Sequence, residues 1–194
     1  MGQVMNATSD DLPAVSRSLA KAFVDDPLIR HLLGGTYDHR RAELSFRMLA
    51  TSMLRHGTVL CTEDRSAAAL WAHVDAWKVP ITEVVRQVPV VVRAYRRHVF
   101  RALGVLNRME RCHPHEPHYY LEVIGTDPVA QGRGYGASLI QPMLDKADAE
   151  GVGAYLESSR DINVPYYRKF GFEVVGEIHH RNGPMMWPMW RDPR

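Results

Sequence analysis

The stretch HYYLEVIGTDPVAQGRGYG, residues 118–136, decides how the rest of the chain is interpreted. It begins as an apolar strand and ends as a glycine-rich loop. Apolar residues recur at helical spacing from Ala137 to Ala149, so the loop opens onto a helix. Free backbone N–H groups at the positive end of that helix suit a phosphate or pyrophosphate, and glycine lets such a ligand approach the backbone closely. The stretch therefore predicts a strand, a nucleotide-binding loop and a helix in succession.

One alternative is a dinucleotide site. Gly132, Gly134 and Ala137 satisfy the G-x-G-x-x-G/A fingerprint, and Glu157 stands near the end of the next strand, where a ribose-binding acid is expected. In a dinucleotide fold, however, the first glycine directly follows the strand, whereas residues 127–131 intervene here. Only about a quarter of the chain follows the helix, too little for the further strand and helix units of such a fold. An NAD(P)-binding oxidoreductase is therefore the second hypothesis.

A second motif lies downstream, NVPYYRKFGF at residues 163–172. Together with QGRGYG at residues 131–136, which follows a strand and an Asp-Pro turn, it resembles the acyl-CoA motifs of the GNAT superfamily of N-acetyltransferases. The resemblance implies one α/β domain over residues 1–194, with a mixed, mostly antiparallel sheet and a central parallel βαβ acyl-CoA unit flanked by helices. Within the superfamily, the run from residue 116 to residue 190 is most similar to the puromycin N-acetyltransferases.

The resemblance implies acetyl-CoA as a cosubstrate and places it on the loop and on the strand before it. In the family the backbone of this strand pairs with the pantetheine arm, and one of its N–H groups can stabilise a developing oxyanion. Glycine inside the strand is consistent with a bulge or a close backbone approach, and an asparagine before the short helix would cap it and touch the CoA arm. The expected cofactor residues are Ile124, Gly125, Thr126, Gln131, Gly132, Arg133, Gly134, Tyr135, Gly136 and Asn163.

Acetyl transfer to an amine requires a neutral nitrogen, so a base is expected. Glu157 matches the puromycin-type pattern near the expected split in the sheet, while Glu122 shares a strand face with Tyr120 and Ile124 by period-two alternation. Both stay candidates, with Glu157 favoured. By family alignment Tyr167 protonates the leaving thiolate, because its hydroxyl donates a proton without being charged at neutral pH.

The segment after the first helix is expected to contribute to the acceptor site. In the family this region contributes to the acceptor pocket, so Phe23, Asp25 and Asp26 are expected substrate contacts, and the two acids suggest a cationic acceptor. The alternative for them is a helix end with solvated acids. The acceptor that the resemblance implies is a primary amine of a small molecule, such as an aminonucleoside or another toxic amine. A noncatalytic acyl-CoA sensor is the third hypothesis.

The composition narrows the partners and the location. At 194 residues with 45% hydrophobic residues and a net charge of +2, the chain fits one domain and gives little reason to expect nucleic acid. No apolar run is long enough for a signal peptide or a membrane span, so a cytoplasmic protein with reduced Cys61 and Cys112 is expected. The segment 112–118 fits no standard zinc spacing and is expected to be a linker, with no metal bound. A homodimer is compatible with the sequence.

Periodicity and turn residues predict the remaining elements. The N-terminal half should contain a strand over Gln3–Ala7, a helix from Leu12 to Phe23 capped by Thr8, Ser9 or Asp10, a helix over Tyr37–His56, and a hairpin of residues 58–62 and 67–74. Residues 81–112 are helical, with a break or kink expected at Pro89. The chain should end with a strand over Ala154–Ser158 and a hairpin of residues 172–178 and 185–190, with Met185, Trp187 and Met189 inward and Pro188 at an edge or bulge.

Overall fold

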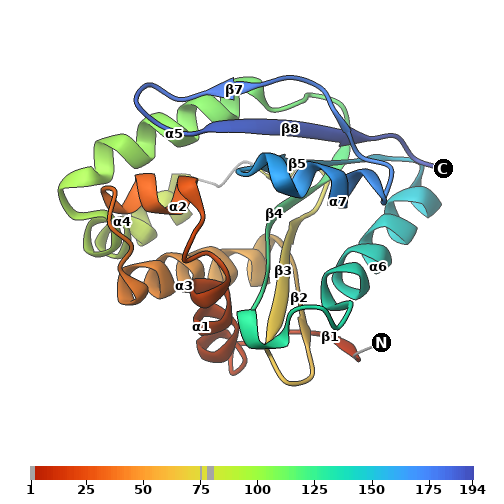
Figure 1. The fold of residues 1–194 in the computed structure, drawn as a ribbon, viewed down its shortest axis with the longest axis horizontal. Helices are drawn as coiled ribbons and strands as arrows, with labels where there is room; N and C mark the ends of the chain where they lie inside the picture. The colour runs from red at the N-terminus through yellow and green to blue at the C-terminus, as the bar shows by residue number, and fades with distance from the viewer. Residues whose placement is uncertain (1–2, 75, 78–80) are drawn as a thin grey trace.

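The computed structural model describes residues 3–74, 76, 77 and 81–194, and within them a single mixed sheet carries helices on both faces (Figure 1). Its eight strands are β1 (Val4–Asn6), β2 (Gly57–Thr62), β3 (Ala67–Ala72), β4 (His118–Thr126), β5 (Gly153–Ser158), β6 (Glu173–Val174), β7 (Ile178–His179) and β8 (Met185–Arg191). The helices are α1 (Leu12–Ala22), α2 (Pro27–Leu33), α3 (His39–His56), α4 (Ile81–Tyr95), α5 (Val99–Cys112), α6 (Tyr135–Glu150) and α7 (Val164–Arg168). Short 3-10 turns are η1 (Arg96–His98), η2 (Pro128–Ala130) and η3 (Asp161–Asn163).

The strand order is β1-β2-β3-β4-β5-β8-β6, and β7 also pairs with β8. Among the described strands every pair is antiparallel except β4 and β5. The predicted mixed, mostly antiparallel sheet with one central parallel βαβ unit is therefore confirmed. A doubly wound dinucleotide fold would need several adjacent parallel strands, so the sheet does not support that alternative.

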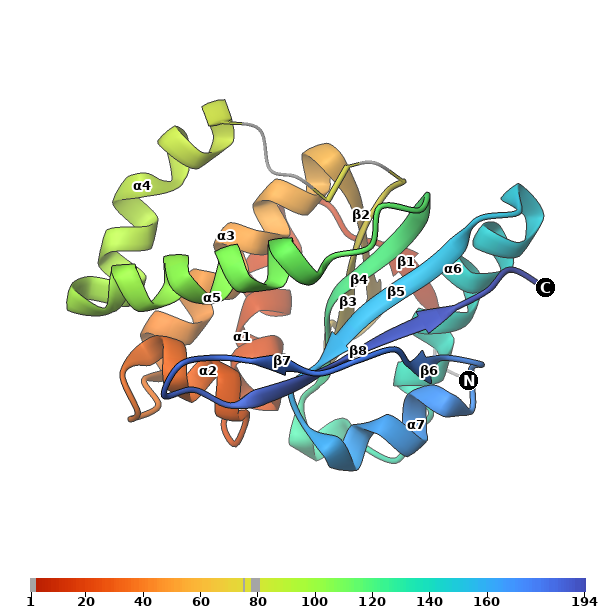
Figure 2. The same cartoon turned by 90° about the horizontal axis from the view of Figure 1, so that it is seen from above.

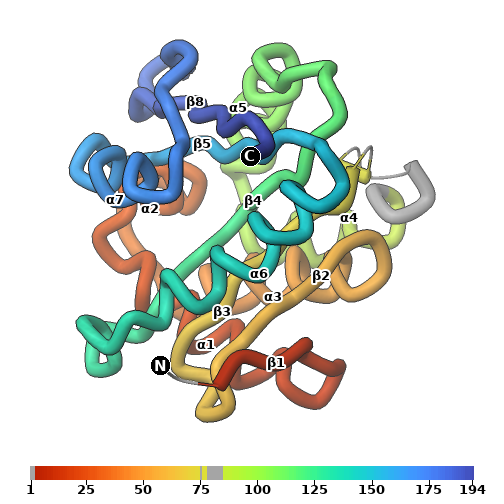
Figure 3. Tube along the Cα trace, turned by 90° about the vertical axis from the view of Figure 1, so that its right-hand side faces the viewer, coloured from red at the N-terminus to blue at the C-terminus, as the bar shows by residue number. Residues whose placement is uncertain are grey.

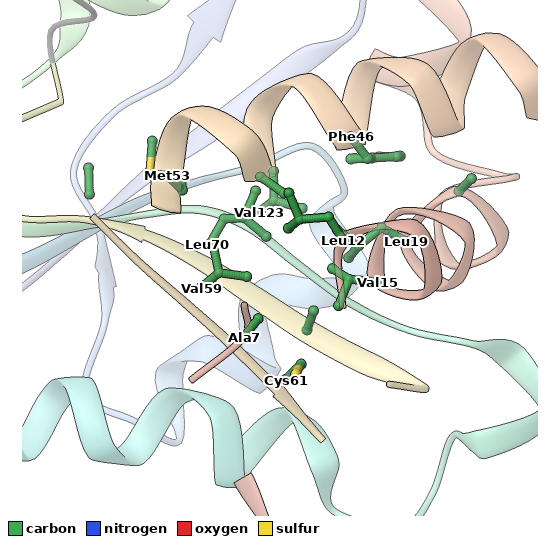
Figure 4. Packing of buried hydrophobic residues seen from close by; sticks show 14 of the residues in the cluster. Ala7, Leu12, Val15, Leu19, Phe46, Met53, Val59, Cys61, Leu70 and Val123 are labelled. Atoms are coloured by element: carbon green, nitrogen blue, oxygen red, sulfur yellow. The ribbon is translucent and has the colours of Figure 1, made fainter. Parts of the chain in front are cut away.

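Helices α1 and α3 cover one face of the sheet. Apolar residues at helical spacing on α1, among them Val15 and Leu19, pack with Phe46 of α3 against Leu70 of β3 and Val123 of β4 (Figure 4). All five side chains are buried. This core holds α1 beside the end of β4, where the predicted loop begins.

Helices α6 and α7 cover the other face, as the views along and across the sheet show (Figures 2 and 3). Leu139, Ile140 and Leu144 of α6 pack on Trp71 of β3, and Tyr167 of α7 joins the same cluster. Helix α6 begins after Gly134 and ends at Gly151, which has a left-handed φ of 66° and caps the last turn. The two cores together fix the glycine-rich loop against the sheet.

The parallel pair β4 and β5 separates partway along its length. The ladder runs from His118 and Gly153 to Leu121 and Leu156, and beyond that register the described strands are not paired with each other. On its other side, β4 pairs with β3 but skips one residue: Leu70 lies opposite Val123, and Trp71 lies opposite Leu121. Glu122 is therefore the extra residue of a β-bulge located where the sheet splits.

The bulge changes which side chains share a face. Tyr120 and Val123 belong to the core under α1 and α3, whereas Leu121 and Ile124 pack with the core under α6. The expectation that Glu122 shares a face with both Tyr120 and Ile124 is wrong, because the inserted residue shifts the alternation by one. The bulge lies at Glu122 and not at Gly125.

Two details of the N-terminal half differ from the sequence prediction. Asp11, not Thr8, Ser9 or Asp10, occupies the N-cap position of α1, and its carboxylate accepts hydrogen bonds from the backbone N–H and the hydroxyl of Thr8. The segment after α1 also forms an additional helix, α2. Asp26 caps it by accepting from Ile29 N at 2.8 Å, and Pro27 occupies its first turn.

The predicted break at Pro89 is misplaced. Helix α4 continues through Pro89, and the chain breaks at η1, where Arg96 has a left-handed φ of 51°. Proline removes the hydrogen bond to the carbonyl of residue 85, but Val85 is 65% exposed, so water can satisfy that carbonyl. In the described part of the chain, no helix is long and apolar enough to cross a membrane.

The C-terminal hairpin is less regular than predicted. Met189 is buried, as expected, but Met185 and Trp187 are only half-buried and Met186 is buried. Pro188 is not at an edge, because β8 lies between β5 and the short strands β6 and β7. The carbonyl of Pro188 accepts a hydrogen bond from Val175 N at 2.9 Å. Val175 lies between β6 and β7, so the N–H that proline lacks is at a point where neither outer strand continues.

Candidate active site

A cavity of about 610 Å³ opens where β4 and β5 separate. Its wall includes both ends of the QGRGYG motif at residues 131–136. It also includes the ends of the two strands and the start of α7. Of the residues predicted from the sequence, it brings together Phe23, Asp26, Glu122, Ile124, Gly125, Thr126, Gln131, Gly132, Gly134, Tyr135, Gly136, Glu157, Asn163 and Tyr167. Arg133 and Asp25 are exposed and are not part of its wall.

The glycine-rich loop forms the end of this cavity nearest α6. Gly132 and Gly134 both have a φ of 78°, which an L side chain rarely adopts, and Gly134 is the N-cap residue of α6. Gly136 is needed for a different reason, because a Cβ there would lie 2.4 Å from the hydroxyl oxygen of Tyr166. The N–H groups at the start of α6 therefore border the cavity, and Gly134 and Gly136 place no side chain of their own there.

The end of β4 forms a second wall. A Cβ at Gly125 would lie 2.9 Å from the Cβ of Ala22 and 3.0 Å from Leu19 Cδ2, so glycine permits α1 to approach the strand. The predicted close backbone approach at Gly125 is confirmed. Because β4 has no ladder partner on its β5 side beyond Leu121 among the described residues, the edge at Ile124 and Thr126 faces the cavity.

Two carboxylates from the two separating strands line the same cavity. Glu157 accepts a hydrogen bond of 2.6 Å from the hydroxyl of Tyr120 through Oε2. Within the described part of the chain, Glu157 Oε1 and Glu122 Oε2 are buried and have no hydrogen-bond partner. Burial first, and then the charge of Glu157, raise the pKa of Glu122 to about 7. Unsatisfied buried carboxylate oxygens in a cavity indicate an acceptor for a bound proton or cation.

Replacing Glu122 by glutamine should stabilise the protein at about pH 8 but not at about pH 4. The folded-state pKa near 7 exceeds the unfolded value of 4.5, so the favourable contribution of the protonated carboxyl is complete below the unfolded pKa and is lost as the pH rises through the folded one. The gain should be on the order of 1–3 kcal/mol in the free energy of unfolding. Urea unfolding of both proteins at the two pH values measures this gain. An equal difference in the free energy of unfolding at both pH values would contradict a buried Glu122 carboxyl with a raised pKa.

Helix α7 places two tyrosines differently. Tyr167 is buried in the core under α6 while still reaching the cavity wall, and burial raises the pKa of its hydroxyl. Tyr166 is half-buried, with its hydroxyl over Gly136. Asn163 occupies the N-cap position of α7, but its side chain makes no capping hydrogen bond, so that part of the prediction is wrong.

The two acids after α1 have separate environments. Asp26 is buried: Oδ1 caps α2 and Oδ2 accepts from the hydroxyl of Ser159, which follows β5. Burial raises the pKa of Asp26 in spite of these hydrogen bonds. Asp25 lies outside the cavity and pairs with Arg30 at 2.8 Å. Phe23 packs on Phe46 with ring centroids 5.0 Å apart and borders the cavity.

Some residues of the site carry no signal in the sequence. Tyr120 lies within the predicted strand, yet its hydroxyl donates to Glu157. His113 was assigned to a linker, yet its Nδ1 lies 3.8 Å from Glu157 Oε1. The contact of Ser159 with Asp26 spans 133 residues. The pairing of β4 with β5 creates the first contact, and no local pattern could have shown any of the three.

Comparison with known proteins agrees with this geometry. The model of the acetyltransferase (GNAT) family matches residues 86–172. An uncharacterized N-acetyltransferase of Schizosaccharomyces pombe is 29% identical over 186 residues, covering 87% of this chain and 73% of that protein. The N-alpha-acetyltransferase RimI of Mycobacterium tuberculosis is 37% identical over 90 residues, covering 45% of this chain and only 56% of that protein.

Solved structures show the same fold over the whole chain. A histone acetyltransferase HPA2 and related acetyltransferase from Corynebacterium glutamicum superposes with a TM-score of 0.76 at 22% identity, covering 100% of this chain and 98% of that one. Arylalkylamine N-acetyltransferase 2 from Aedes aegypti superposes with a TM-score of 0.67 at 13% identity, covering 99% of each. The architecture is thus the GNAT fold. The family model over residues 86–172 and the two relatives are similarities to N-acetyltransferases, and together they support an acyltransferase enzyme.

Proposed function

We propose that this enzyme transfers the acetyl group of acetyl-CoA directly to the primary amine of a small molecule. One observation carries the proposal: a single cavity joins the free N–H groups at the start of α6 to two buried carboxylates and to Tyr167. Enzymes of the GNAT family generally use acetyl-CoA. The cavity therefore contains what binding of the cosubstrate, deprotonation of an amine and protonation of a thiolate each require.

The loop and the edge of β4 are assigned to acetyl-CoA. Backbone N–H groups of residues 131–136 and the dipole of α6 favour its pyrophosphate. Arg133, exposed beside this loop, can add a charge to a phosphate. The open edge of β4 at residues 124–126 offers backbone groups to the pantetheine amides in the manner of an added strand, and Asn163 borders the same space.

The acidic wall is assigned to the acceptor. An ammonium group entering between β4 and β5 meets Glu157 and Glu122, and a carboxylate there attracts the cation and then takes its proton. We assign the base to Glu157, whose Oε2 is held by Tyr120 and whose Oε1 is available. Phe23 and Asp26, which border the same cavity, are assigned as the remaining contacts of the acceptor. Asp25 is not assigned to the acceptor, because it lies outside the cavity and forms an ion pair with Arg30.

Tyr167 is assigned to protonate the leaving thiolate. Replacing it by phenylalanine should lower kcat by roughly 10²-fold, the lower end for loss of a general acid, with little loss of acetyl-CoA affinity. Tyr119→Phe is a matched control, because Tyr119 is buried in the same core but its hydroxyl donates to Glu150, away from the cavity. Steady-state kinetics across the pH range measure both variants. Full turnover of Tyr167→Phe at every pH would remove Tyr167 from the mechanism.

The acceptor class is tested by identifying the acetylated product. The resemblance of residues 116–190 to puromycin N-acetyltransferases supports an aminonucleoside or another toxic amine as the first candidate. The names of the relatives add two others: an arylalkylamine and the α-amine of a protein. Mass spectrometry after incubation with acetyl-CoA and puromycin, an arylalkylamine or a peptide distinguishes them. Acetylation of the peptide alone would contradict a small-molecule acceptor.

A further inference from the structure

Two buried histidines lie where the chain passes from α5 into β4: His113 directly follows α5, and His118 is the first residue of β4. His113 and His118 are 5% and 2% exposed. The His113 ring stacks on Trp77 with centroids 3.8 Å apart and contacts the rings of Tyr120 and Tyr155 edge-on. These three ring contacts fix the orientation of the imidazole, so the partners of its two nitrogens are defined.

Hydrogen bonds determine which nitrogens carry protons. His118 Nδ1 lies 2.6 Å from the carbonyl oxygen of Glu116, and a carbonyl only accepts, so His118 Nδ1 carries a proton. In a neutral His118, Nε2 is then an acceptor. His113 Nε2 lies 2.9 Å from it and must donate. A neutral His113 therefore has its lone pair on Nδ1.

That lone pair faces the proposed base. His113 Nδ1 lies 3.8 Å from Glu157 Oε1, the buried oxygen without a hydrogen-bond partner among the described residues. Oε2 of the same carboxylate is already bound by the hydroxyl of Tyr120. Two acceptors thus lie 3.8 Å apart, and one added proton between them would let them form a hydrogen bond. Catalytic hydrogen bonds are often long before substrate binds.

We propose that Glu157 and His113 together hold the single proton that the acceptor ammonium gives up. This rests on the proposed function, in which Glu157 is the base. The N–H bond of the ammonium breaks, its electron pair stays on nitrogen, and the proton is shared by Glu157 Oε1 and His113 Nδ1. The amine then bonds to the acetyl carbon as the C–S bond breaks, and Tyr167 protonates sulfur. The second nitrogen proton restores Tyr167, and the shared proton returns to water after product release. His113 is a positioning residue that acts through Glu157.

Other charged and titratable groups surround the pair. Glu122 adds negative charge from β4, and His180, before β8, lies close enough for Glu157 to act on it. The hydroxyls of Tyr120 and Tyr155 stay protonated, because burial and the charge of Glu157 raise the pKa of each. The titratable groups from the elements packed around the pair are therefore Glu122, His118, Tyr120, Tyr155, Cys112 and His180.

Nitrogen-15 NMR of the histidine rings tests the pair without any activity assay. Above the titration of both rings, His118 should be the Nδ1–H tautomer and His113 the Nε2–H tautomer. A neutral His113 with its proton on Nδ1 would overturn the inference, since that proton would already lie between the two acceptors.

Kinetics test the role of the pair in the reaction. His113→Gln keeps an amide N–H for His118 but cannot accept the proton. We expect kcat/KM to fall about tenfold and the acidic limb of its pH profile to move by a unit or more, with unchanged acetyl-CoA affinity. His73→Gln is the matched control, a part-buried histidine bonded to Thr58 and outside the cavity. A pH profile of His113→Gln that matches the wild type in shape would overturn the inference, whereas a wild-type protein without transferase activity would overturn the proposed function instead.

Discussion

Replacing Glu157 by glutamine is expected to lower kcat/KM by roughly 10²- to 10⁴-fold, the range for loss of a general base. Glutamine has the same shape, and its amide oxygen can still accept from Tyr120, which donates to Glu157 Oε2 at 2.6 Å. The fold should therefore survive while the acceptor for the ammonium proton is lost. Initial rates with saturating acetyl-CoA, together with a thermal melt of each protein, separate the catalytic loss from a loss of stability.

Glu122→Gln decides between the two carboxylates. Glu122 lines the same cavity at the bulge of β4, and its raised pKa leaves it partly protonated near neutrality. With Glu157 as the base, Glu122→Gln should lose less than about tenfold in kcat/KM. The opposite pattern, with Glu157→Gln nearly normal and Glu122→Gln inactive, would transfer the base to Glu122.

Replacing Gly134 by glutamate is expected to weaken acetyl-CoA binding by about 10²-fold or more. Gly134 has a φ of 78° at the N-cap of α6, so any side chain there is strained, and a carboxylate would repel the cosubstrate's phosphates. Gly151→Glu is matched in strain and charge, because Gly151 has a φ of 66° with open space around it at the other end of the same helix. Isothermal titration calorimetry compares them, and equal affinity in both variants would remove the loop from the cosubstrate site.

The parts of the site that the sequence predicted are those encoded within one local stretch. The glycines at 132, 134 and 136 and the apolar repeat of α6 give the loop and helix directly, because φ and close approach restrict those positions to glycine. Helix α2 could also have been found. Asp26 followed by Pro27 is an N-cap and first-turn signal.

The remaining features depend on contacts between distant segments. The bulge at Glu122 exists only in the register with β3, so alternation along β4 alone gave the wrong face. The break at Arg96 requires a left-handed arginine, which local propensity disfavours. His113 approaches Glu157 because its ring packs on Trp77, Tyr120 and Tyr155, whereas a segment with two prolines predicts only an extended linker.

The measurement that tests the central claim most directly is thiol release from acetyl-CoA by the purified protein over a panel of amines led by puromycin, with Gly134→Glu as the control. We predict release that depends on one class of small amine and is lost in the control. If the protein binds acetyl-CoA but releases no thiol with any amine, it is an acyl-CoA-binding module, and the assignment of Glu157 and Tyr167 is wrong. If it does not bind acetyl-CoA at all, the loop at the start of α6 serves another ligand and the account is contradicted.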